Sequence, residues 1–540
     1  MFQHKSKALL FFLVALGFHL NGLAQNNQTN GAVGAFIGGG INNTISNTAS
    51  YSFIGSGGAN TNASFSSVIV GGSNNLIDSN GARNFIGAGG YNLISAFASG
   101  IVAGFGNEVQ PDANRSFIGA GEVNIIESGS THSVIGGGSS NAIVGVSGKS
   151  FIGGGECNVI YVSGGTIAGG SYNSTEGLWS FIGGGRGNRG NGFNTTICGG
   201  EANYINSLGS FIGGGTENSI SGLHVTHSSL SGGKNNLIYA SHSSLSGGIS
   251  NTIYASYSVI SGGLRNIASN SYSTVGGGAV NKNSGYCGTI GGGRLNILTG
   301  ESATLAGGSE NRNSGLWGTL SGGYTNQVSG DWATVCGGVS NVAAARNATI
   351  PGGSKNTVTN NGSFVWGDGS SATASWADNT FTVRAIGGTR FYTAAGTATG
   401  VRLAARGTAW ASLSDREVKQ DFQPVDKRGI LKKVADLPVT SWTYKADLSR
   451  RYIGPMAQDF HSTFGLGDDD KSITTLDTDG VLLASVQGLV EELKERDRVM
   501  AWERLQNASA LAERDGEIED LRKSFRDLKA KVDSLAPPKK

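Results

Sequence analysis

One short phrase, an aliphatic anchor followed by Gly-Gly and then Asn, recurs from Ile37 to Val365 and limits what this chain can fold into. The 22 anchors are separated by 21 gaps, of which fifteen are 15 residues long, five are 17 and one is 18. The sixth residue after the anchor is Asn in 21 of the 22 repeats, and Ser371 is the exception. A short fixed period with β-branched anchors and glycine turns predicts the stacked coils of a β-solenoid.

Each coil is expected to supply two short strands, one at the anchor and one at Asn-x-Ile, with coils stacked about 4.8 Å apart. We interpret the Asn position structurally, because Asn tolerates left-handed turns and stacked amides can hydrogen-bond along the stack. A coil of this length holds only a few medium-sized apolar side chains. Lateral association of several rods is therefore expected to bury the remaining apolar surface.

These repeats resemble the β-roll heads of YadA-like trimeric autotransporter adhesins over roughly residues 35–370. The resemblance implies a mainly β fold in which homotrimeric β-solenoids form a fibre or head. We do not expect the membrane barrel with which such adhesins end in residues 414–540.

The chain consists of two parts with different compositions. Of its 540 residues 89 are Gly and only 7 are Pro, which excludes collagen. Residues 401–540 hold 24 of the 40 Lys and Arg and 24 of the 38 Asp and Glu. The formal net charge is +2 and no basic stripe is present, so nucleic acid is not an expected partner.

The first 24 residues read as a secretory signal peptide. Lys5 and Lys7 precede an apolar stretch from Ala8 to Leu20, and small residues flank Leu23. We therefore predict a secreted or outer cell-surface protein, with no integral membrane segment in the mature chain.

The repeats contain few residues that could bind a metal or catalyse a reaction. Residues 1–400 contain five Asp, whereas a calcium-binding roll needs Asp in each repeat, and their few acids are too scattered for a polysaccharide-cleaving site. No metal and no cofactor is predicted. A row of Thr at 15-residue spacing from Thr274 to Thr349 is explained by β-propensity.

An aromatic stripe occupies the position three residues before the anchor. Stacking that stabilises coils or the subunit interface is the preferred interpretation, and binding of a surface glycan or receptor is the alternative. The adjacent His pair lacks the third ligand that a metal site needs. The stripe consists of Tyr51, Trp179, His227, His242, Tyr257, Tyr272, Trp317 and Trp332.

The four cysteines lie at least three coils apart, farther than the 7 Å or so that a disulfide allows between Cα atoms. We therefore expect free, packed thiols at Cys157, Cys198, Cys287 and Cys336.

The period is lost after the repeats, and residues 371–413 are predicted to form a β-rich neck. Residues 414–540 contain four blocks, SDREVKQDFQPVD, LPVTSWTYK, RYIGPMAQDF and DTDGVLLASVQGLVEELKER. In this order they resemble the C-terminal intramolecular chaperone domain of phage endosialidases and tail fibres, also found in myelin regulatory factor. That family folds a trimeric β-fibre and then cuts itself off.

The resemblance implies a Ser-Lys autopeptidase. Its nucleophile would be Ser414, its base Lys419, and its scissile bond Leu413–Ser414. A Ser hydroxyl needs a base to attack, and Lys serves as one only when desolvation leaves it neutral. Many relatives carry His where this chain has Tyr452, so activity is in doubt if that His is catalytic.

The tail after Leu482 is predicted to be helical. Leu482, Val486, Leu489 and Leu493 fit a and d positions, and a second series begins at Ile518. We divide this region into a chaperone and autopeptidase domain at 414–490 and a trimeric coiled coil at 491–535.

The sequence thus predicts a secreted homotrimeric fibre, adhesin-like or structural, whose chaperone domain directs trimer folding and then autocleaves once at Leu413–Ser414. No other enzyme activity is predicted. The alternatives are a phage-type tail fibre or spike, and a β-solenoid that binds or degrades polysaccharide.

Overall fold

The structure is a computed structural model that describes residues 26–396, 399–506 and 511–534. The predicted signal peptide, residues 1–24, lies outside the described residues. Contacts between residues divide the chain into a unit that ends at Arg384 and a unit that begins at Ala385. Each unit is described by itself below.

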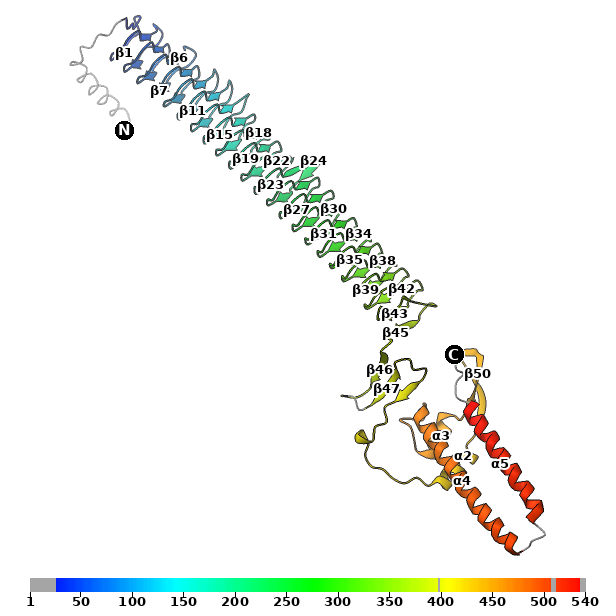
Figure 1. Ribbon diagram of the computed structural model, residues 1–540. Coiled ribbons are helices and arrows are strands. Elements are labelled where there is room, and N and C mark those ends of the chain that lie inside the picture. The colour runs from blue at the N-terminus through cyan, green and yellow to red at the C-terminus, as the bar shows by residue number, and fades with distance from the viewer. Residues whose placement is uncertain (1–25, 397–398, 507–510, 535–540) are drawn as a thin grey trace. The chain divides into compact units, whose positions relative to one another are not determined.

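The first unit is a β-solenoid, as the repeats predict, and its coils follow one another along a single axis in Figure 1. The odd-numbered strands, from β1 (Phe36–Ile37) to β45 (Phe381–Arg384), form one parallel sheet of 23 strands. The even-numbered strands, from β2 (Thr44–Ile45) to β44 (Thr373–Ala374), form a second parallel sheet. Nearly all are two residues long, so each coil supplies the two short strands expected. The parallel pairing continues past residue 370, through β45.

The register stacks each repeat position on the same position of the next coil. Phe36 pairs with Phe53 and Ile37 with Ile54, and this pattern continues from coil to coil. The anchors from Ile54 to Val365 are fully buried. A third row of single-residue bridges, such as Ile41 with Gly58, closes the coil between the two sheets. Every repeat position therefore forms a line along the rod.

The regular spacing of Asn builds a continuous amide ladder inside the rod. Asn203 is typical, because its Nδ2 donates to Asn188 Oδ1 at 3.0 Å and to the Gly215 carbonyl at 2.9 Å. Its Oδ1 accepts from the backbone and side-chain nitrogens of Asn218, both at 3.1 Å. The predicted ladder is confirmed. The left-handed turn belongs instead to the preceding residue, such as Ala202 at φ 54°, so that part of the interpretation was wrong.

The glycine three residues after the anchor lets the coils approach each other. Gly200 has φ +90°, and a Cβ there would lie 2.1 Å from the Gly215 carbonyl oxygen of the next coil. Only glycine combines this backbone conformation with so close a contact. This position accounts for the second Gly of the repeated Gly-Gly.

The single 18-residue gap is accommodated on the even-numbered sheet. The extra residues lengthen β24 to Ser219–Thr226, opposite β22 at Tyr204–Leu208. Leu223, within the insertion, is 94% exposed. On the odd-numbered sheet the anchors on either side of the insertion still pair, Ile212 with Leu230.

The second unit begins with an antiparallel meander of β46 (Gly388–Tyr392), β47 (Gly400–Ala404) and β48 (Trp410–Ser412). A 3-10 turn η1 (Arg416–Val418) and helix α2 (Lys427–Asp436) follow. Strands β49 (Thr440–Tyr444) and β50 (Asp447–Gly454) form a hairpin, and helix α3 spans Ala457–Phe464. The unit is therefore a small α+β region.

Two long helices end the described chain, α4 (Thr475–Gln506) and α5 (Leu511–Ser534). Helical structure after Leu482 is thus confirmed in the described residues, where it begins at Thr475 and comprises α4 and α5. The two apolar series are out of heptad phase, and here they lie on separate helices that line shared cavities. A coiled coil between copies stays a prediction.

Candidate functional site

The two residues of the predicted dyad meet across one short turn. Asp415 caps η1 by accepting from the Glu417 backbone N–H at 3.0 Å. The Lys419 N–H closes the turn on the Arg416 carbonyl at 3.2 Å. Lys419 Nζ then donates to Ser414 Oγ at 2.5 Å. The sequence separation of five residues is therefore sufficient to bring nucleophile and amine into contact.

The strand before the dyad fixes the other side of the predicted scissile bond. The Leu413 N–H donates to the Gly400 carbonyl at 3.0 Å, directly after Ser412 of β48 pairs with Val401 of β47. The Leu413–Ser414 bond thus lies at the junction between the meander and η1. This backbone contact was not foreseen, because neither residue type nor spacing marks it in the sequence.

Water surrounds the dyad in the single chain. Ser414 and Lys419 are both exposed, and Leu413 is half-buried. For Lys to act as a base the hydrogen bond must reverse, so that the Ser hydroxyl donates to a neutral amine. Removal of water favours that neutral form. The structure thus shows the Ser414–Lys419 contact of the predicted dyad but not the dry surroundings that the predicted chemistry would need.

Tyr452 belongs to an aromatic cluster on the β49–β50 hairpin. Its ring stacks on Trp442 with centroids 4.9 Å apart and contacts Tyr444 edge-on at 5.4 Å. The Arg450 guanidinium covers the Tyr452 ring at 5.0 Å from its centroid. These contacts give Tyr452 a packing role in the hairpin.

Helix α2 is held tightly against α4. Lys427 pairs with Glu491 at 3.3 Å, and Arg428 pairs with Glu492 at 3.5 Å. Gly488 permits the approach, because a Cβ there would lie 2.3 Å from the Lys427 carbonyl oxygen. The last quoted sequence block therefore docks onto the segment that follows the dyad.

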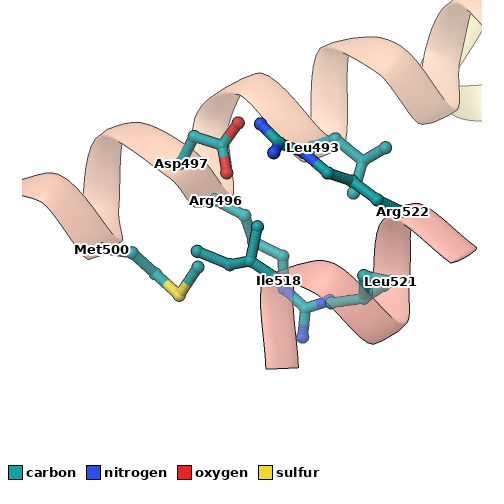
Figure 2. A pocket seen from close by; sticks show the side chains of 7 residues that line it. All are labelled: Leu493, Arg496, Asp497, Met500, Ile518, Leu521 and Arg522. Carbon is teal, nitrogen blue, oxygen red and sulfur yellow. The ribbon is translucent and has the colours of Figure 1, made fainter. Parts of the chain in front are cut away.

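The long helices leave open space between their apolar series. Leu493 and Met500 of α4 and Ile518 and Leu521 of α5 line a cavity of about 130 Å³, whose side chains Figure 2 shows between the ribbons. A larger apolar groove of about 350 Å³ lies among α2, α4 and α5. It is lined by Leu431, Val434, Leu482, Leu483, Val486, Leu489, Phe525 and Leu528, among others.

The aromatic stripe is a stacked ladder over four coils. The centroid distances are 5.5 Å for His227–His242, 5.1 Å for His242–Tyr257 and 4.9 Å for Tyr257–Tyr272. The Tyr257 and Tyr272 rings are within 5° of parallel, so the face of each ring is turned toward its neighbour in the stack. Sugars bind aromatic faces, and these are occupied. The geometry favours stacking over glycan binding here.

The other members of the stripe are also engaged. Trp317 stacks on Trp332 at 5.1 Å, and the Arg346 guanidinium covers Trp332 at 4.5 Å. Tyr51 meets Phe65 edge-on at 5.8 Å. Trp179 lies so close to the preceding coil that a Cβ on Gly164 would meet it at 2.3 Å. No binding platform runs along the whole stripe.

The thiols are unpaired, but they are not packed as expected. Cys157 is half-buried, whereas Cys198, Cys287 and Cys336 are exposed because their repeat positions face outward. Within the described ranges, no three His, Cys, Asp or Glu side chains gather closely enough for a metal ion. None of the helices in those ranges combines the length and hydropathy of a bilayer crossing.

Comparison with known proteins bears on the C-terminal unit. Residues 414–465 match the family model described as chaperone of endosialidase, and the match starts at Ser414. A search of curated proteins finds no match to the chain. A β-solenoid followed by such a domain fits a phage tail-fibre-like protein, and the family implies autoproteolytic chaperone activity. Residues 414–465 of this chain are therefore a chaperone-of-endosialidase domain, C-terminal to a long β-solenoid.

Proposed function

We propose that this chain is an exported homotrimeric fibre whose C-terminal domain aligns three copies and then cleaves once before Ser414. The observation that carries the proposal is the 2.5 Å contact between Lys419 Nζ and Ser414 Oγ at the first residue of the matched domain. The product would be a β-solenoid fibre that ends at Leu413 and a released C-terminal fragment.

The chemistry is intramolecular. Neutral Lys419 takes the hydroxyl proton of Ser414, and Oγ attacks the Leu413 carbonyl carbon, the neighbouring group in the chain. The C–N bond between Leu413 and Ser414 breaks, and the proton passes to the departing nitrogen. An ester now joins the Leu413 carbonyl to Ser414 Oγ. One water hydrolyses it and leaves a Leu413 carboxylate and a free Ser414 amino terminus.

Few apolar side chains of the C-terminal unit are buried. This supports assembly of several copies as the step that would remove water from the dyad. Among its described residues, the buried apolar side chains are those of Phe460 and Val481. Phe422, Val425 and Leu483 are exposed instead, close in sequence to the dyad or on α4. Neighbouring copies packed on these side chains would exclude water from the region of the dyad. Cleavage would then follow assembly and not precede it.

Alignment before cleavage addresses a folding problem of the repeats. Coils with nearly identical sequences can pair in many registers, and a terminal clamp selects one. Removal of the clamp makes the process irreversible, so the fibre would be kinetically stable.

The test is the intact mass of the purified wild-type chain beside Ser414→Ala and Lys419→Met. We expect wild type to yield a fragment that starts at Ser414, and both variants to stay whole at the same oligomeric mass. Ser412→Ala is the matched control, because Ser412 is an exposed Ser two residues before the dyad and should cleave normally. Cleavage at another bond, or normal cleavage of Ser414→Ala, would refute the assignment.

A further inference from the structure

One long face of the solenoid carries no charge. This outer face consists of the residues immediately before and after each anchor on the odd-numbered sheet. From Phe36 to Pro351 none of these positions is Asp, Glu, Lys or Arg. The corresponding outward positions of the even-numbered sheet include Glu108, Arg189 and Lys282. Depletion of charge is a property of interface cores and not of solvated surfaces.

The N-terminal half of the outer face is also strongly apolar. From Phe85 onward Phe occupies every second coil, and the coils between carry smaller residues, Gly100, Val134, Thr166 and Thr196. The Phe residues remain 37–42% exposed. The Phe residues of this alternating series are Phe85, Phe117, Phe151, Phe181 and Phe211.

Three of these rings lie close to the backbone of their own strand. The residue two positions after each Phe is Gly, and a Cβ on Gly87, Gly153 or Gly213 would lie 3.4 Å from the ring before it. The Phe117 ring also leans over the small coil beside it, 3.4 Å from the Cβ position of Gly100. The result is a fixed series of apolar ridges and shallow steps.

The size of this surface can be compared with that of a specific interface. Twelve coils from Phe36 to Phe211 span about 53 Å at the strand spacing, and the three residues from the one before each anchor to the one after it are about 10 Å wide. The product, about 500 Å² for each copy, is more than half of the roughly 800 Å² per partner of a standard protein interface. Apolar patches of about this size on a protein surface are often functional.

We propose that the outer face over residues 36–211 is the surface on which a second copy of this chain packs in parallel register. In parallel register the Phe-bearing coils of the copies lie at equal positions along the rods. Their rings extend toward the neighbouring coils that carry smaller residues. The inference rests on the proposed function, which aligns the copies from their C-terminal ends. The absence of charge along the whole face lets identical copies meet without like-charge repulsion.

The native cysteines provide the test. Cys198 follows the anchor Ile197 and lies on the outer face, whereas Cys287 lies in the turn row of the aromatic stripe, and both are exposed. Two full-length variants keep only one of them, with the other three cysteines changed to Ser. The assembled proteins are treated with a short bis-maleimide and run on a denaturing gel. We expect covalent dimers from the Cys198 variant and single chains from the Cys287 variant.

A second pair of variants measures the contribution of the rings. In the Ser414→Ala chain, which stays uncleaved, Phe151→Ser with Phe181→Ser should shift dissociation of the assembly to at least tenfold higher chain concentration, because exposed rings contribute to association more than to the fold. The control combines Thr304→Ser with Thr319→Ser, which lie at the same repeat position in coils that carry Thr there. It should shift the dissociation concentration less than twofold.

The outcomes separate this inference from the proposed function. Cross-linking through Cys287 alone, or no shift with the Phe variants, in a chain of trimeric mass would overturn the outer-face interface and leave the proposed function standing. A monomeric native mass with no cross-linking in either variant would overturn both.

Discussion

In the solenoid the coils of a single chain fully bury the anchors from Ile54 to Val365, whereas in the C-terminal unit Leu483 is 66% and Phe422 67% exposed. The solenoid gains its order from neighbours at 15 residues along the same chain. The C-terminal unit has an α2–α4 core with open apolar grooves beside it. The solenoid is thus packed within one chain, whereas the C-terminal unit leaves apolar surface that the proposed assembly would cover.

The largest effect is expected where α2 meets α4. Gly488→Ala would place a Cβ 2.3 Å from the Lys427 carbonyl oxygen, which belongs to backbone and cannot move aside. We predict loss of the oligomer and of cleavage, measured by native mass and by gel. Gly480→Ala on the same helix has no atom within 4 Å of the new Cβ and should behave as wild type. Equal behaviour of the two variants would contradict the docking of α2 on α4.

Within the solenoid, the second Gly of a repeat is expected to be the most sensitive position. Gly200→Ala forces a left-handed alanine against the Gly215 carbonyl and should destabilise the neighbouring coils by about 4 kcal/mol. Hydrogen exchange of coils 182–230 would report the opening. Gly292→Ala, with no atom within 4 Å, should leave exchange unchanged. Unchanged hydrogen-exchange protection in Gly200→Ala would show that the coils accommodate the new Cβ without loss of stability. That result would contradict this prediction.

The amide ladder should show a difference between its middle and its end. Asn203→Ala removes bonds to both neighbouring coils and should cost about 3 kcal/mol through unsatisfied buried groups. Asn356 is the last rung, and its Oδ1 has no partner because Ser371 replaces the next Asn. Asn356→Ala should therefore cost about 1 kcal/mol. Denaturant unfolding of the two variants compares them, and equal losses would contradict the ladder as the source of stability.

The smallest effect concerns the stacked rings. Tyr257 has φ 60°, a conformation that is strained for a bulky residue, and it stacks between His242 and Tyr272. Tyr257→Ala keeps the strain and loses the stacking, a cost of about 1 kcal/mol. Tyr257→Gly loses the stacking but relieves the strain, so it should be nearly neutral. A stability order with Gly below Ala would show that the left-handed conformation at this position carries no strain for glycine to relieve.

The two regions also differ in how far sequence predicts structure. The period of the anchors indicated the coils, the strands and the Asn ladder, because a repeated unit can satisfy itself only by stacking on its neighbours. The period did not reveal that the ladder starts before the first anchor, at Asn27, whose Oδ1 accepts from the Asn43 N–H. That residue has no anchor of its own to mark it.

In the C-terminal unit the sequence blocks identified the domain and paired Ser414 with Lys419, since a local turn decides that contact. They could not reveal the contact between Leu413 and Gly400, nor the division of the helical tail into α4 and α5. Heptad spacing predicts an apolar face for a helix but not which other helix covers it.

The central claim is that assembly completes the dyad, and the dependence of cleavage on chain concentration tests it most directly. The uncleaved, denatured precursor is refolded at two concentrations, with Ser414→Ala as the blank, and the fragment that starts at Ser414 is followed by mass. Because a complex of copies forms by mass action, a roughly tenfold dilution should slow cleavage per chain by about tenfold or more. A cleavage rate per chain that does not change on dilution would show that one copy suffices and would contradict the account.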